Sequence, residues 1–325
     1  MNQYTIKTLE GLEFQSDINL PILDVAQKQG INFEYSCKNG QCGVCKITLL
    51  EGEVSELHSQ TALTEKDIRD NKILSCCCTA KTDILIDAED LTALKAIEIQ
   101  TLPARINKIA KKAENIIELE LRLPPTATMP FLEGQFIDVI GPNGVRRSYS
   151  IANSSNEKLI TLLIKQVEKG VLSQYWFNEA KENDLLRIEG PKGSFFFREV
   201  KKHIIFLATG TGIAPIKSIL DKLSQSPNTM QISLYWGNRK PDDFFWQPEY
   251  EDLDINYTPV LSRKNDTWPY KIGYVQNIVI EEHINLENTQ VYACGSLDMI
   301  ESAKELFIQH GLEEKYFHSD AFVSS

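Results

Sequence analysis

The sequence predicts a protein of three successive domains: an α+β domain, an antiparallel β-barrel, and an α/β domain with a parallel sheet. Short strand patterns and two helix signals fill residues 1–95, whereas short strands separated by turn signals fill residues 96–200. Strands alternate with helices over residues 201–325. Serial short strands are typical of antiparallel barrels, and strand–helix alternation is typical of parallel sheets.

The first domain is predicted to hold two helices and a small sheet. One helix is expected from Pro21, which suits a first helical turn, to Gly30, which suits the end of a helix. A second helix is expected at Thr64, where Asp67 completes a capping pattern. A linker is expected over residues 93–101. The predicted strands are residues 4–8, 46–50 and 83–86.

A cysteine-rich loop is the most specific feature of the first domain. Cys37, Cys42 and Cys45 follow the spacing C-x4-C-x2-C, and Cys76 comes about thirty residues later. This is the ligand spacing of a plant-type 2Fe-2S cluster, which neutralises the crowded thiolates. A disulfide framework and a zinc site are the competing interpretations. Seven cysteines are an odd number, no signal-peptide pattern precedes them, and the second C-x2-C pair of a zinc site is missing.

The fourth cluster ligand has three candidates, because Cys76, Cys77 and Cys78 are adjacent. Cys76 comes first after the apolar residues Ile73 and Leu74, at the expected end of a strand. We therefore predict Cys76 as the ligand and the other two as packed thiols.

The second domain is predicted to be the barrel, interrupted by a single helix from Val171 to about Ala180. The tetrapeptide Arg147–Ser150 (RSYS) combines a phosphate partner, an aromatic ring and a hydroxyl, which are the groups needed to hold a flavin. Gly170 and Ser173 lie at the start of the helix, where a pyrophosphate would find free N–H groups. The expected strands are residues 107–110, 116–123, 135–140, 149–152, 159–166 and 185–188.

The third domain begins with an apolar strand over residues 203–208, followed by the turn Gly210-Thr211-Gly212 and a helix over residues 213–223. Glycines allow the backbone to approach a dinucleotide pyrophosphate, and Pro215 suits the first helical turn. Cys294 and Gly295 close a later strand and are expected on the same rim of the sheet, where Cys294 is either a buried thiol or a neighbour of the nicotinamide.

Together these motifs resemble the ferredoxin-NADP reductase superfamily over residues 103–325 and a plant-type ferredoxin, a β-grasp domain, over residues 1–95. Within that group the chain resembles the CDP-6-deoxy-delta-3,4-glucoseen reductases, which serve CDP-4-keto-6-deoxyglucose 3-dehydratases. The domain boundaries are then expected at 95/96 and 200/201. The resembling stretches are Tyr35–Cys37, Leu121–Ala127, Arg147–Asn153, Leu186–Gly193, Tyr235–Gly237, Val291–Leu297 and Ser319–Val323.

The resemblance implies roles for single residues. Arg147 and Ser173 would contact the FAD phosphates, and Tyr149 would meet the isoalloxazine together with Ser150. The glycine turn would hold the nicotinamide dinucleotide. Asp320 stands where many relatives carry glutamate. The residues expected around the hydride path are Ser150, Cys294 and Asp320, with Phe322 near the flavin ring.

The resemblance further implies the direction of electron flow. FAD would take a hydride from NAD(P)H and pass single electrons to the 2Fe-2S cluster, which would reduce a separate protein. In the resembling group that protein is a pyridoxamine-phosphate-dependent CDP-sugar 3-dehydratase of 3,6-dideoxyhexose biosynthesis. The reductase component of a multicomponent oxygenase is the alternative. A ferredoxin-like carrier with a vestigial flavin domain is a third hypothesis, against which the intact flavin motifs argue.

The choice between NADH and NADPH is weakly encoded. Arg239 and Lys240 suit a 2′-phosphate, but they precede Asp242 and Asp243, which oppose one. The resemblance favours NADH.

Charge and hydropathy limit the partners. The net charge is −11, with 9 basic and 15 acidic groups in residues 1–95. An acidic chain argues against a nucleic-acid partner, and the acidic first domain suits docking to a basic protein surface, although such a surplus is more often a solvated face. No apolar run is long enough to span a bilayer, so we expect a cytoplasmic protein that has no membrane partner.

Overall fold

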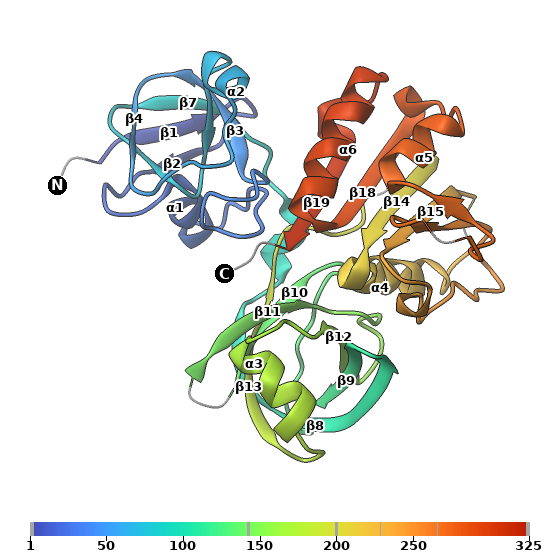
Figure 1. Cartoon of the computed structure of the whole chain (residues 1–325). Helices are drawn as coiled ribbons and strands as arrows, with labels where there is room; N and C mark the ends of the chain where they lie inside the picture. Colours follow the sequence, from blue (N-terminus) through green and yellow to red (C-terminus); the bar gives the residue numbers. More distant parts are fainter. Residues whose placement is uncertain (1–2, 142–143, 199–200, 228, 265, 323–325) are drawn as a thin grey trace. The chain divides into compact units, whose positions relative to one another are not determined.

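The computed structural model describes residues 3–141, 144–198, 201–227, 229–264 and 266–322 (Figure 1). The described chain forms two compact units. One holds residues 3–97 and Gly193–Phe195, and the other holds residues 98–192 and 196–322. Residue 200, at the second predicted boundary, and Val323, in the last resembling stretch, lie outside the described residues. Both domain boundaries stay predictions.

The first unit is built on a five-stranded mixed sheet in the order β2-β1-β7-β3-β5. The first helix packs its apolar side chains into the core, where Ile22, Leu23 and Ala26 are almost fully buried. The α+β prediction is confirmed for this unit. The strands are β1 (Thr5–Thr8), β2 (Glu13–Gln15), β3 (Lys46–Glu51), β5 (Lys72–Leu74) and β7 (Ile84–Asp87), with a separate pair β4 (Val54–Glu56) and β6 (Cys78–Ala80).

Both predicted helices of the first unit form, each with the expected end signals. In α1 (Ile22–Lys28), Pro21 occupies the N-cap position, and Gly30 follows the helix with a φ of 77°. In α2 (Glu65–Arg69), the Thr64 side chain accepts a hydrogen bond from the Asp67 backbone, and the Asp67 side chain accepts one from the Thr64 backbone. A short 3-10 helix, Thr92–Ala96, then leads toward the second unit.

The second unit begins with a six-stranded antiparallel sheet in the order β11-β10-β13-β8-β9-β12. An isolated bridge between Ile151, just after β11, and Leu162 of β12 joins the two ends of the sheet and closes the barrel. This confirms the predicted fold of the domain. The strands are β8 (Gln100–Ala113), β9 (Ile116–Arg122), β10 (Phe136–Ile140), β11 (Arg146–Ser150), β12 (Leu159–Lys165) and β13 (Leu185–Lys192).

Several strand boundaries in the barrel differ from the sequence prediction, and β8, β11 and β13 differ most. β8 starts at Gln100, inside the predicted linker, because Pro103 lies where β8 pairs with β13 alone and a missing N–H is tolerated. β11 starts at Arg146 rather than at Tyr149, because this end strand of the sheet exposes polar side chains that an apolar pattern does not reveal. The predicted barrel helix is α3 (Val171–Gln174), continued by a π-helical turn, Tyr175–Glu179.

The second unit also contains a six-stranded parallel sheet in the order β17-β16-β15-β14-β18-β19 (Figure 1). β14 lies between β15 and β18, so the chain order reverses at β14, and its carboxyl end is the position where such sheets bind ligands. The strands are β14 (His203–Thr209), β15 (Gln231–Asn238), β16 (Ile255–Leu261), β17 (Lys271–Ile272), β18 (Thr289–Ser296) and β19 (Phe317–Phe322).

Three helices accompany this sheet. α4 (Ile213–Leu223) packs against β14 and β18, whereas α5 (Val275–Glu281) and α6 (Leu297–Gln309) pack against each other. The α/β prediction is confirmed, including the strand and helix on either side of the glycine turn. None of the helices in the described ranges is long and apolar enough to cross a membrane.

Candidate functional site

The four predicted cluster cysteines lie in the first unit as two close pairs. The Cys42 thiol donates a hydrogen bond to Cys37, and the Cys45 Sγ donates one to the Cys76 Sγ over 3.2 Å. Cys37 is half-buried and the other three are buried. Over the described chain, no three His, Cys, Asp or Glu side chains form a group for a single metal ion. Two pairs are the arrangement that two irons need, whereas zinc needs its ligands around one point.

Hydrogen bonds within the pairs already favour the thiolate form that binds metal. The donation from Cys42 lowers the pKa of Cys37 to about 5, and the donation from Cys45 lowers the pKa of Cys76 to about 7. The donor of each pair has a raised pKa, because it gives its proton to the hydrogen bond. In each pair, the thiol that accepts the hydrogen bond therefore ionises more easily, which favours the thiolate form that binds metal.

The cysteine loop is shaped by residues with positive φ and by the segment after β4. Lys38, Gly40 and Gly43 have φ values of 56°, 78° and 70°. The Gly40 carbonyl accepts hydrogen bonds from the Thr61 hydroxyl and the Ala62 amide, and a Cβ at Gly40 would overlap with the Ser59 carbonyl. Glycine is needed at Gly40 for both its φ and its close approach.

Cys77 and Cys78 are both buried, and Cys77 contacts one member of the pairs. The Cys77 thiol lies 3.5 Å from the Cys76 Sγ and 3.6 Å from the Ser59 carbonyl, to which it donates. Burial raises the pKa of both thiols to about 12, so they stay protonated. Only Cys76 contacts Cys45 in the described structure. These contacts support Cys76 as the fourth ligand, which stays a prediction.

The flavin motif lies on β11, whose side chains alternate between two faces. Arg146 and Ser148 contact Asp138 of the adjacent β10, whereas Arg147 and Tyr149 project from the opposite face. The Arg147 guanidinium donates to the Arg146 carbonyl, and no acidic partner of Arg147 is found among the described residues. Arg147 is therefore available for a phosphate group.

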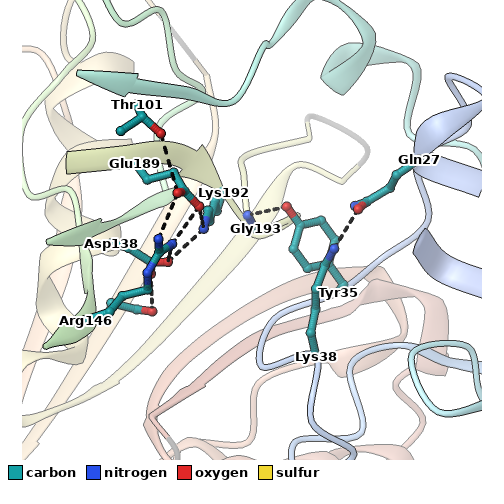
Figure 2. A network of polar contacts seen from close by, with 10 residues as sticks. Gln27, Tyr35, Lys38, Thr101, Asp138, Arg146, Glu189, Lys192 and Gly193 are labelled. Carbon is teal, nitrogen blue, oxygen red and sulfur yellow. Dashed lines mark hydrogen bonds and ion pairs between the residues drawn. The ribbon is translucent and has the colours of Figure 1, made fainter. Parts of the chain in front are cut away.

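Arg146, by contrast, is neutralised in a four-charge network with Asp138, Glu189 and Lys192 (Figure 2). Its guanidinium makes two hydrogen bonds to Glu189, of 2.7 and 3.0 Å, which lower the pKa of Glu189 to about 2. Burial opposes ionisation of Asp138, but hydrogen bonds from Lys192 and Ser148 outweigh it and lower its pKa. The network links β11 to side chains of β10 and β13.

Tyr149 is held by Trp176 from the π-helical turn. The Trp176 Nε1 donates to the Tyr149 hydroxyl over 2.9 Å, and the two rings meet edge to face. Ser173 accepts a hydrogen bond from the Val167 amide, which stabilises the turn before α3 and leaves the hydroxyl proton for another acceptor. Gly170 is the N-cap residue of α3. These residues support the flavin motif, and their roles stay predictions.

The glycine turn of the third domain lies against the end of β18. A Cβ at Gly212 would overlap with the Cys294 carbonyl, and a Cβ at Gly295 would overlap with the Thr209 hydroxyl. The Trp236 Nε1 donates to the Gly210 carbonyl over 2.9 Å. The turn is thus held from β14, β15 and β18, and Pro215 lies buried in the first turn of α4.

Two of the three residues expected on the hydride path are neighbours. Cys294 and Asp320 are register partners on β18 and β19, and burial raises the pKa of Cys294 well above its usual value, so its thiol is neutral. Ser150 is buried at the end of β11, and none of the contacts among described residues joins it to this pair. Phe322, at the end of β19, is 41% exposed.

Comparison with known proteins assigns each domain. The 2Fe-2S iron-sulfur cluster binding domain family matches residues 7–81, the oxidoreductase FAD-binding domain family matches residues 103–197, and the oxidoreductase NAD-binding domain family matches residues 206–305. The CDP-6-deoxy-L-threo-D-glycero-4-hexulose-3-dehydrase reductase of Yersinia pseudotuberculosis is 44% identical over 322 residues, which are 97% of each chain. The chain belongs to the ferredoxin-NADP reductase-like proteins with an N-terminal 2Fe-2S ferredoxin domain.

Other relatives share the same organisation. The phenol hydroxylase P5 protein of Acinetobacter pittii is 31% identical over 339 residues, which are 99% of this chain and 95% of that protein. A solved ferredoxin reductase in carbazole 1,9a-dioxygenase is 25% identical, with a TM-score of 0.69 over 99% of both chains. The chain is therefore an NAD(P)H-dependent iron–sulfur flavoprotein that transfers electrons through FAD and a 2Fe-2S cluster.

The residues present fit the cofactors of this reductase family. Two cysteine pairs with lowered thiol pKa values suit the cluster, and an arginine without a carboxylate partner among the described residues suits FAD. The turn and the adjacent end of β18, where Gly212 and Gly295 have no room for a side chain, suit the dinucleotide. Sequence reasoning missed the residues that support these groups. Lys165 of β12 is one, because its Nζ lies 3.9 Å from where a Cβ at Gly210 would stand. Trp176 and Asp138 are the others.

Proposed function

We propose that this reductase uses NADH and delivers electrons to a pyridoxamine-phosphate-dependent CDP-sugar 3-dehydratase of 3,6-dideoxyhexose biosynthesis. The similarity to the Yersinia dehydrase reductase carries this proposal, because it extends over 97% of both chains at 44% identity. The phenol hydroxylase protein is similar over the same length at 31%, which supports an oxygenase as the second candidate acceptor. We place the activity in the cytoplasm, where thiol ligands stay reduced.

The proposed chemistry divides between the cofactors and the chain. A bound FAD accepts a hydride and returns single electrons, and a bound 2Fe-2S cluster carries one electron at a time. Arg147 binds a flavin phosphate, since its own contacts leave the charge uncompensated. Tyr149 packs against the flavin ring and is held in place by Trp176. Ser150 lies next along the strand, near the flavin ring, and Ser173 contributes a hydroxyl to the phosphates.

The proposed dinucleotide site depends on the absence of side chains, which lets the backbone approach the ligand. The backbone of Gly210, Thr211 and Gly212 approaches the pyrophosphate, and Lys165 adds a positive charge beside the turn. The neutral Cys294 thiol lines the nicotinamide site without presenting a second nucleophile, and its partner Asp320 lies on the adjacent strand. Gly295 lets β18 approach Thr209, whose hydroxyl accepts from the Ser296 amide.

The preference for NADH follows from charges near the end of β15. Lys240 lies within 3.7 Å of the Glu114 carboxylate, so one of the two cations that suit a 2′-phosphate already has an acidic partner. Asp242 and Asp243 follow directly in a 3-10 turn, Pro241–Asp243. The carboxylates of this turn would repel a 2′-phosphate, whereas they would not repel the uncharged 2′-hydroxyl of NADH.

Reconstitution tests the acceptor. The holoenzyme is mixed with a pyridoxamine-phosphate-loaded CDP-4-keto-6-deoxyglucose 3-dehydratase and its CDP-sugar substrate, and NADH consumption and deoxygenated product are measured. We expect product to form with NADH and to depend on both proteins. An enzyme that reduces cytochrome c but gives no product with the dehydratase, and instead supports hydroxylation by an oxygenase component, would favour the second acceptor.

A further inference from the structure

One segment follows the strand that carries the proposed flavin residues, and another follows the turn that carries the proposed nucleotide residues. These two following segments contact each other. β11 leads into residues 151–156, and the Gly210–Gly212 turn leads into α4. Both segments belong to the second unit. Hydride transfer needs the reacting atoms about 3–3.5 Å apart, so the relation between these segments bears on the reaction.

Ser218 of α4 makes the central contact. Its hydroxyl donates to the Asn153 carbonyl over 2.7 Å, and both residues are buried, with Ser218 at 0% exposure. One residue earlier on each segment, the Lys217 Nζ donates to the Ala152 carbonyl over 3.2 Å. A buried hydroxyl that satisfies a backbone carbonyl is costly to remove, because the carbonyl is left without a partner.

The segment that receives these bonds is itself fixed to the barrel. The Asn153 side-chain amide donates to the Leu159 carbonyl over 2.9 Å and accepts from the Thr161 amide over 2.7 Å. The Ala152 amide donates to the Thr161 carbonyl over 2.8 Å. Ala152 and Asn153 therefore cannot move away from β12 without breaking three hydrogen bonds, and they transmit the position of the barrel to α4.

A second contact lies beyond the C-terminal end of α4. The Gln225 side chain donates to the Ser154 hydroxyl over 3.1 Å and accepts a hydrogen bond from the Asn156 side chain. The two contacts are seven residues apart on the helical side, about two helical turns. A helix held at two such points resists both sliding and tilting.

We propose that Ser218 is a positioning residue for hydride transfer, which with Lys217 and Gln225 locks the nucleotide-binding turn and its helix onto the segment that follows the flavin strand. These contacts would keep the nicotinamide site at a fixed distance and orientation from the flavin site. Their loss would lower the rate of hydride transfer and would leave the affinity for the dinucleotide nearly unchanged. The inference rests on the NAD(P)H and FAD chemistry of the family and is independent of the acceptor protein.

The test uses the holoenzyme with Ser218→Ala and, in a second variant, with Lys217→Met and Gln225→Ala combined. Stopped-flow absorbance at saturating NADH measures flavin reduction without an acceptor, titration with NAD+ measures affinity, and hydrogen exchange measures protection of the amides in residues 151–156. We expect flavin reduction about tenfold slower, NAD+ affinity within about threefold of the wild type, and about tenfold faster exchange.

Lys222→Ala is the matched control, because Lys222 lies exposed on the same helix. It is expected to leave all three measurements unchanged. If Ser218→Ala does not fold, the double variant carries the test, since Lys217 and Gln225 are not fully buried. Wild-type flavin reduction in the folded variant, a loss of affinity equal to the loss of rate, or slower reduction without faster exchange would each overturn the proposal.

Discussion

The cysteine loop and the glycine turn, the two proposed cofactor sites, differ in the kind of group that each offers a ligand. In the cysteine loop the functional atoms belong to side chains, and the pairs Cys37–Cys42 and Cys45–Cys76 are already in contact. In the glycine turn the proposed functional groups are backbone N–H groups, and a Cβ at Gly212 would overlap with the Cys294 carbonyl. The first site is therefore destroyed by removing an atom and the second by adding one.

The largest expected effect comes from Cys42→Ser, which removes a ligand from the first pair. The cluster should be lost, because a serine hydroxyl does not supply the thiolate that iron needs. Reduction of ferricyanide by NADH should persist, since FAD and NADH bind the second unit, while reduction of cytochrome c should fall more than a hundredfold. Loss of flavin reduction in a variant that still binds FAD would contradict this division of labour.

The next effect separates the three adjacent cysteines. Cys76→Ser should abolish the normal paramagnetic signal of the reduced cluster, whereas Cys77→Ser and Cys78→Ser should keep it, because these two thiols make no contact with Cys45 in the described structure. Electron paramagnetic resonance of the reduced proteins decides it. A normal signal in Cys76→Ser would mean that another cysteine is the ligand.

Adding a methyl group to the glycine turn should be nearly as damaging. Gly212→Ala would place a Cβ into the Cys294 carbonyl, so we expect flavin reduction by NADH to fall about a hundredfold or more, with FAD content unchanged. Gly210→Ala is the matched control, because only the Lys165 Nζ lies near its Cβ position. Gly210→Ala should slow flavin reduction less than Gly212→Ala does, because its main cost is the backbone strain of an alanine at a φ of 56°. Equal effects of the two changes would argue against steric exclusion at Gly212.

Removing the positive charge beside the turn should have a smaller effect. Lys165→Ala is expected to raise the KM for NADH about tenfold and to leave kcat nearly unchanged, because a phosphate contact contributes about 1.4 kcal/mol to binding in both the ground and transition states. Steady-state kinetics with ferricyanide measure both constants. A change in kcat alone would place Lys165 on the transfer step instead.

The smallest effect concerns Asp67, in the first turn of α2. Burial opposes its ionisation, but hydrogen bonds from Lys46 and Thr64 outweigh it and lower its pKa to about 2. A lowered pKa stabilises the folded state above the unfolded value near 4, and this stabilisation is lost as the pH falls from about 4 to about 2. Asp67→Asn should therefore cost about 1 kcal/mol at pH 7, from the cap and the ion pair. Urea unfolding followed by cluster absorbance should show this difference shrink below pH 4.

The same contrast explains what the sequence could predict. Local sequence patterns predicted the three folds, the cysteine spacing and the glycine turn, because each depends mainly on residues close together in the chain. Asn153 and Ser218 are 65 positions apart, and Asp138 and Lys192 are 54 apart. Their roles arise only when strands and helices meet, so no local pattern marks them. The start of β11 was missed for a related reason, because Arg146 finds its carboxylates on two other strands.

The first unit is not one continuous stretch of sequence, because Gly193–Phe195 belong to it together with residues 3–97. The Tyr35 amide donates to the Ser194 hydroxyl over 2.7 Å. The Tyr35 hydroxyl accepts a hydrogen bond from the Gly193 amide over 3.0 Å (Figure 2). Tyr35 lies two positions before the predicted ligand Cys37. A recombination event that exchanged only residues 1–97 would therefore join this tyrosine to a foreign tripeptide. Chimaeras between members of the family should tolerate such an exchange only when the glycine and serine travel with it or are already present in the recipient.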